Sequence, residues 1–155
     1  MLHVGSQAPA FELPDASMEM IQLSSFLGKK NVVLYFYPRD GTPVCTMEAI
    51  NFSDHEDAFD ECDTVVFGVS RDDCMVHEEF RDKHGISLQL LSDAECEVMK
   101  KYDVLTEPIG ATRAGVHRAT FVIDKKGMVR HILRDLKPRE HVASVLKIVR
   151  QIHGH

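Results

Sequence analysis

The stretch NVVLYFY, residues 31–37, decides the fold, because it is a continuous apolar run of β-branched and aromatic residues followed by Pro38. Such a run is typical of a strand buried on both faces of a sheet. Residues 63–70, DTVVFGVS, repeat the pattern, and residues 43–61 between them space their apolar side chains as a helix does. Strand, helix and strand at this spacing predict a right-handed crossover between two parallel strands.

The rest of the chain predicts a hairpin before this unit, and further helices and a second hairpin after it. These segments together indicate the α/β class: a mixed central sheet flanked by helices, with an N-terminal hairpin, in a single domain of residues 1–155. A helix following Pro138 carries its apolar residues on one stripe. The other segments are a hairpin (9–14 and 20–23), a helical turn (24–30), helices (74–84 and 94–102), a strand (88–91), a loop (103–117) and a hairpin (119–124 and 128–133).

Composition excludes several classes of protein and of partner. The chain has 155 residues, of which 44% are hydrophobic and 27% charged, which excludes wholesale disorder. The formal net charge of −6 argues against a nucleic-acid partner, which would require a basic surface. No apolar run approaches the roughly 20 residues of a membrane span, so we expect no membrane partner. No secretory signal is visible at Met1, which leads us to expect a cytoplasmic protein.

The four cysteines include no C-x-x-C pair, so neither a zinc ribbon nor a dithiol of the thioredoxin type is encoded. One of them, Cys45, follows the buried strand, at the edge of the sheet where open α/β proteins bind ligands. Thr42 and Pro43 suit the N-cap and the first position of a helix, which puts Cys45 at its third position. Free backbone N–H groups and the helix dipole favour a thiolate there. The alternative interpretation is a buried structural cysteine.

Pro38-x-x-x-Thr42-x-x-Cys45 matches the active-site motif of the peroxiredoxins. The wider segment 36–49 resembles the Q-type subfamily, also called bacterioferritin comigratory protein. Residues 68–72 and 117–124 are similar to two further blocks of that family, and the likeness extends from about residue 4 to residue 150. This resemblance implies a thioredoxin-like fold, a thiol-dependent peroxidase that reduces hydrogen peroxide and alkyl hydroperoxides, and no metal or organic cofactor.

The resemblance also implies residue roles. Cys45 is the expected peroxidatic cysteine, which attacks the peroxide as a thiolate and becomes a sulfenic acid. Thr42 orients the peroxide, and Pro38 shields the sulfur from water. Arg118 stabilises the thiolate, and Glu48 holds Arg118 in place. Apart from Cys45, each of these residues also has a purely structural interpretation. Pro38 would then end a strand, Thr42 cap a helix, Arg118 lie at the surface and Glu48 lie at a solvated helix position.

The chain departs from the family at the resolving cysteine, because Ile50 and Arg81 occupy the two positions where relatives carry it. Cys74 lies two helical turns before Arg81 and is the best substitute. Cys62 and Cys96 fall in places that suit inert thiols. We therefore expect a one-cysteine mechanism, in which thioredoxin, glutaredoxin or another external thiol reduces the sulfenic acid. An internal disulfide to Cys74 is the minority alternative.

Two further expectations concern partners and metals. The competing function is a non-catalytic redox relay or binding module on a thioredoxin fold, and the resemblance favours a monomer. Cys74-x-x-His77 has the spacing of metal ligands, but it is a single pair, and we expect no metal site. A solvated helix face is the simpler explanation for His77. The same holds for the charged residues of this helix, which are Glu78, Glu79, Arg81, Asp82 and Lys83.

Overall fold

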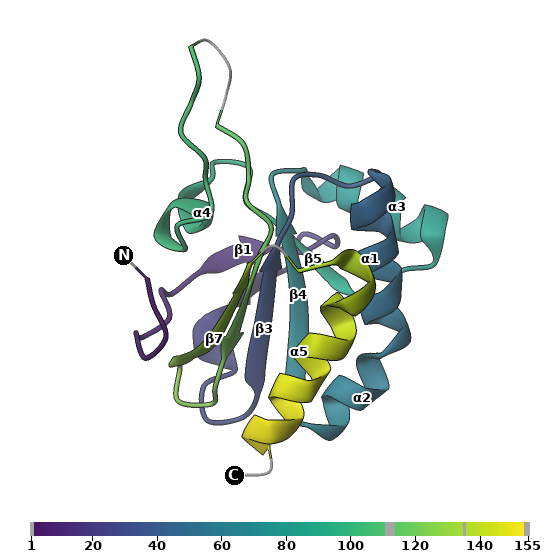
Figure 1. Cartoon of the computed structure of the whole chain (residues 1–155). Coiled ribbons are helices and arrows are strands. Elements are labelled where there is room, and N and C mark those ends of the chain that lie inside the picture. Colours follow the sequence, from purple (N-terminus) through teal and green to yellow (C-terminus); the bar gives the residue numbers. More distant parts are fainter. Residues whose placement is uncertain (1, 111–113, 135, 154–155) are drawn as a thin grey trace.

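A mixed sheet of five strands forms the centre of the computed structural model, which describes residues 2–110, 114–134 and 136–153 (Figure 1). Three neighbouring strands are parallel, and the other two add to them in antiparallel fashion, as the sequence predicts. A separate two-stranded hairpin precedes them. The central strands are, in spatial order, β5 (Gln89–Ser92), β4 (Thr64–Ser70), β3 (Asn31–Phe36), β6 (Ala119–Ile123) and β7 (Val129–Arg134), and the hairpin is β1 (Glu12–Pro14) with β2 (Met20–Gln22).

Helices cover one face of this sheet, while the hairpin and one short helix cover the other (Figure 1). Among the described residues, no helix combines the length and apolar character needed to cross a membrane. The first face carries α1 (Pro43–Asp54), α2 (Glu56–Glu61), α3 (Cys74–His84) and α5 (Pro138–His153); the second carries α4 (Glu97–Lys101) and a 3₁₀ turn (Leu23–Ser25).

The alternation of side chains along β3 explains this layered arrangement. Every residue of the strand is buried, which confirms the prediction made from its apolar run. Side chains of a strand point alternately to opposite faces, so β3 supplies both cores at once. Val32, Leu34 and Phe36 pack on the side of the hairpin and α4, whereas Val33 and Tyr35 pack under the long helices.

The prediction of a single helix over residues 43–61 was wrong, because the chain breaks at His55 into α1 and α2. The ring nitrogen Nδ1 of His55 lies 2.7 Å from the carbonyl oxygen of Asn51. The backbone N–H of His55 instead donates to Phe52. A side chain that takes the carbonyl of the preceding turn competes with the helical ladder, and the helix ends there.

The predicted helix over 94–102 is also shorter in the structure. The Asp93 carboxylate accepts the backbone N–H groups of Val98 and Met99, which fixes the start of α4 from outside the helix. Cys96 precedes the helix in a left-handed conformation, with φ of 59°, and is not a helix residue as expected. Of the predicted loop over 103–117, residues 111–113 lie outside the described residues.

Strand register places three chain segments at one end of the sheet. The last residue of β3, Phe36, pairs with Ala119, the first residue of the antiparallel β6. Arg118 therefore lies beside the loop that leads from β3 into α1, although the two segments are far apart in sequence. Cys45 lies in the first turn of α1, at this same end.

Gly68 in β4 is expected not to tolerate alanine. A Cβ atom there would lie 2.9 Å from the Tyr35 ring and 3.0 Å from a methyl group of Leu90. Tyr35 stacks on Phe52, with ring centroids 4.8 Å apart, so the ring has little room to move. We expect Gly68→Ala to lower the free energy of unfolding by about 1–3 kcal/mol in urea titrations. Gly115→Ala, in a loop, serves as the control, and equal effects of the two substitutions would contradict the packing argument.

Candidate active site

The start of α1 holds Cys45 as the sequence predicts. Thr42 is the N-cap with φ −72° and ψ 150°, and its Oγ1 accepts the backbone N–H of Cys45 at 3.3 Å. Pro43 takes the first helical position, where the missing N–H costs nothing. The Cys45 side chain is almost fully buried, at 2% exposure. Its sulfur therefore lies in a protected site near the positive end of the helix.

Arg118 links this sulfur to a buried carboxylate. Its Nη2 lies 3.3 Å from Cys45 Sγ, and its Nη1 donates to Glu48 Oε1 at 2.7 Å. Glu48 follows Cys45 by three residues on α1, so the two side chains project from the same side of the helix. The Glu48 side chain is 6% exposed and that of Arg118 is 36% exposed. A guanidinium held in this way can stabilise a thiolate and the negative charge that develops on a reacting oxygen.

A residue not identified from the sequence completes this chain of contacts. His141, from α5, donates from Nδ1 to Oε2 of Glu48, the oxygen that Arg118 leaves unused. Its Nε2 lies 2.6 Å from the hydroxyl of Thr120. The ring packs edge-on against Phe52 and Tyr35, with centroids 5.1 and 5.7 Å away. Glu48 is therefore held on both oxygens, by a cation on one side and by a packed imidazole on the other.

The sequence contained one signal for His141. It precedes Val145 by four residues and Val149 by eight, so it continues the apolar stripe of α5 toward the N-terminus. A histidine at 6% exposure on such a stripe needs polar partners inside the protein, and here it has two.

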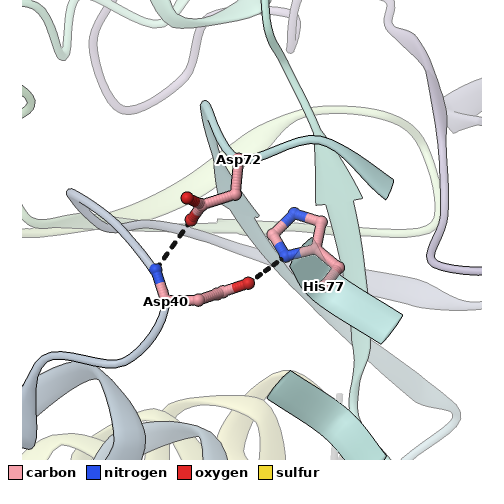
Figure 2. A group of neighbouring side chains, drawn as sticks. All are labelled: Asp40, Asp72 and His77. Carbon is pink, nitrogen blue, oxygen red and sulfur yellow. Dashed lines mark hydrogen bonds and ion pairs between the residues drawn. The ribbon is translucent and has the colours of Figure 1, made fainter. Parts of the chain in front are cut away.

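Asp40 anchors the loop that carries Pro38 and Thr42 (Figure 2). Its backbone N–H donates to Asp72 Oδ2 at 2.7 Å. Its own carboxylate accepts from the Tyr37 hydroxyl at 2.5 Å through Oδ1 and lies 2.5 Å from Nδ1 of His77 through Oδ2. Pro38 is half-buried between the strand and this anchored residue.

The expectation of a solvated face was wrong for His77, whose side chain is fully buried. His77 and Phe80, three residues apart, form the inward side of α3. Glu78 and Glu79 between them are exposed, as expected. A helix with one narrow buried face buries single residues in the core, while the residues next to them in sequence remain exposed to solvent.

Asp40, Asp72 and His77 have ligand atoms within 4.8 Å of one another, which is compatible with a metal site. Hydrogen bonds already account for these atoms, however. Asp72 Oδ2 accepts from the Ser70 hydroxyl as well as from Asp40, and Nδ1 of His77 is directed at the Asp40 carboxylate. A metal ion would have to displace the proton between imidazole and carboxylate, whose side chains are 0% and 2% exposed. We therefore treat the group as a hydrogen-bonded network.

Cys74, the candidate resolving residue, is the first residue of α3 and is partly buried. Burial raises the pKa of its thiol above the ordinary value, and the nearby carboxylates of Asp15 and Asp73 raise it further. No disulfide joins Cys74 to Cys45 in the structure. The surroundings of Cys74 therefore disfavour a thiolate, in contrast to the cationic group beside Cys45.

Comparisons with known proteins identify the family of this chain. Residues 4–132 match the AhpC/TSA family. Peroxiredoxin Bcp of Bacillus subtilis is 39% identical over 153 residues, which cover 97% of each chain. Among solved structures, peroxidoxin BcpB of Mycobacterium tuberculosis superposes with a TM-score of 0.90 at 31% identity, covering 98% of this chain and 99% of that one.

The bacterioferritin comigratory protein of Xanthomonas campestris, studied for its alkyl peroxide reduction activity, gives a TM-score of 0.86 at 29% identity, over 92% of each chain. These structures confirm the predicted thioredoxin-like fold. With the family match, the relatives and the fold in agreement, the chain belongs to the AhpC/TSA family and is a thiol-dependent peroxidase of the peroxiredoxin type.

Proposed function

We propose that the chain reduces hydrogen peroxide and alkyl hydroperoxides by a one-cysteine mechanism. The Cys45 thiolate attacks one peroxide oxygen, so an S–O bond forms while the O–O bond breaks. The sulfur is oxidised to a sulfenic acid, and the other oxygen leaves as water or an alcohol after taking up a proton. An external thiol then attacks the sulfenic sulfur and releases water, and a second thiol frees Cys45 by forming a disulfide with the first.

The contact between Arg118 and Cys45 is the observation that carries this proposal. A guanidinium 3.3 Å from Sγ stabilises the attacking thiolate, and it also lies close to where charge appears on the leaving oxygen. Glu48 and His141 hold the guanidinium at that place. A redox relay would require neither Thr42 nor Arg118 beside the sulfur, whereas both contact Cys45 here.

Thr42 and Pro38 complete the proposed machinery. Because Thr42 Oγ1 accepts from the Cys45 backbone through one lone pair, its O–H and its other lone pair remain for the peroxide. Pro38 has no backbone N–H group, so it offers water no hydrogen-bond donor in this loop and helps to keep water from the sulfur.

The surroundings of Cys74 support an external reductant. A thiol with a raised pKa is a poor nucleophile toward a sulfenic acid at neutral pH, and acidic neighbours reinforce that property. We propose thioredoxin, or a small thiol, as the physiological reductant.

Intact-mass spectrometry after one equivalent of hydrogen peroxide tests the proposal. The wild-type protein should rapidly gain one oxygen, because Cys45 combines a protected site with a cationic neighbour. Cys45→Ser should show no rapid change, whereas Cys74→Ser should behave as the wild type does. A loss of two hydrogens that disappears in Cys74→Ser would replace the one-cysteine mechanism with an internal disulfide. Absence of any rapid change in the wild type would refute peroxide reduction by this site.

Three substitutions of Thr42 separate its role as helix cap from its role toward the peroxide. Thr42→Ser keeps both roles, and Thr42→Asn keeps the cap alone. Thr42→Val loses both, at a cost of about 1 kcal/mol in unfolding free energy. If the hydroxyl acts on the reacting oxygens, Thr42→Asn and Thr42→Val should each slow the oxidation of Cys45 by roughly 10²-fold, as measured by stopped flow. Near wild-type rates for Thr42→Asn would reduce Thr42 to a cap.

His141 is expected to act as a positioning residue through Glu48. His141→Asn places an amide nitrogen near the former Nδ1 and keeps the donor to Glu48, whereas His141→Gln places it near Nε2 and loses that donor. We expect His141→Gln to slow peroxide oxidation of Cys45 roughly tenfold, since a hydrogen bond to a charged group contributes about 1.5–3 kcal/mol to the stability of the arrangement it holds.

The pH profile of Cys45 alkylation distinguishes positioning from packing. With His141→Gln the midpoint should move to higher pH, because a displaced guanidinium stabilises the thiolate less, and His141→Asn should restore it. If both variants lowered stability but left the midpoint in place, His141 would be a packing residue only.

A further inference from the structure

The burial of Cys45 hinders the reduction step more than it hinders the peroxide step. A peroxide is small, whereas the thiol that reduces the sulfenic acid belongs to a larger molecule and must approach the sulfur directly. With Cys45 at 2% exposure, that approach requires the start of α1 and the preceding loop to move. Whatever fastens this loop therefore affects both halves of the proposed cycle.

Asp40 links this loop to the neighbouring elements. Figure 2 shows its backbone N–H directed at Asp72, which follows β4, and its carboxylate directed at His77 on α3. The Tyr37 hydroxyl donates to the other carboxylate oxygen at 2.5 Å, at the end of the buried strand. The Asp40 side chain is 2% exposed, so these partners replace water almost completely.

His77 is the strongest of these links because of its second contact. Its Nε2 lies 3.0 Å from the carbonyl oxygen of Leu91 in β5, and a carbonyl can only accept. Nε2 therefore donates to Leu91, while Nδ1 shares a proton with the Asp40 carboxylate. The fully buried ring thus ties Asp40 to β5 through two polar contacts. Removing one partner of such a buried pair leaves the other polar group without a partner in the interior.

We propose that His77 is a positioning residue of this peroxidase: through Asp40 it fastens the loop carrying Pro38 and Thr42 to α3, and release of this contact exposes Cys45 to the reducing thiol. The inference rests on the proposed function, since it assumes an external reductant. With the pair intact, Thr42 keeps its place at Cys45 and the peroxide step is fast. With the pair broken, the loop opens, peroxide oxidation slows and the sulfur becomes accessible to larger reagents.

Two substitutions of His77 test this directly. His77→Asn offers an amide N–H near the former Nδ1, so it keeps the link to Asp40 and loses the one to Leu91. His77→Gln offers it near Nε2, so it keeps Leu91 and loses Asp40. We expect His77→Gln to raise the rate of Cys45 alkylation by iodoacetamide in the reduced protein roughly tenfold. The same variant should slow peroxide oxidation by a similar factor. His77→Asn should restore both rates to within about threefold of wild type.

Peptide mapping by mass spectrometry follows Cys45 separately from the other cysteines, and hydrogen exchange of residues 38–48 reports the loop itself. Val149→Ala, at a fully buried position two turns further along α5 than His141, is the control for lost stability without a lost link. It should leave Cys45 alkylation unchanged under native conditions. Faster exchange of residues 38–48 in His77→Gln, but not in Val149→Ala, would support the proposal.

Equal alkylation rates for His77→Gln and His77→Asn would overturn the proposal, as would a rise in Val149→Ala matching that in His77→Gln. Either result would make His77 a buried structural residue. Because alkylation is measured without peroxide, these results are independent of whether wild-type Cys45 reacts with peroxide. A wild-type protein inert to peroxide would instead refute the proposed function.

Discussion

The guanidinium of Arg118 is the group on which the rest of the site depends, because it touches both the sulfur of Cys45 and the carboxylate of Glu48. Two features of the fold bring these groups together. The antiparallel register of β3 and β6 places Arg118 at the end of the buried strand. The first turns of α1 then present sulfur and carboxylate on one side of the helix, at a distance that one planar cation can span.

Two buried carboxylates fix this arrangement, and each is held by a histidine from a different helix. Glu48 contacts His141 on α5, and Asp40 contacts His77 on α3. Their second contacts differ: the hydroxyl of Thr120 can donate to Nε2 of His141 or accept from it, whereas the carbonyl of Leu91 can only accept from Nε2 of His77. Each histidine thus ties a buried carboxylate to a second element of the sheet.

The features that could be predicted from the sequence are those that depend on residues close together in the chain. Apolar runs indicated the parallel core, and the cap signal placed Cys45 at the third position of its helix. The place of Arg118 came from family resemblance, since no local pattern links residues separated by 70 positions. His77 and His141 were not assigned to the site because burial of a helical histidine is decided by what packs against it. The break at His55 likewise depends on a ring contact that helix periodicity does not record.

The contrast between the cysteines bears on how the cycle closes. Cys45 faces a guanidinium, while Cys74 is partly buried and faces Asp15 and Asp73, so only the first site favours a thiolate. A resolving thiol must itself ionise to attack a sulfenic acid, and this fold raises the cost of doing so at Cys74. A thiol from another molecule avoids that cost, but it meets a buried sulfur instead. The controlling event in reduction is then the opening of the loop, which is why its fastening to α3 through Asp40 matters as much as the chemistry at the sulfur.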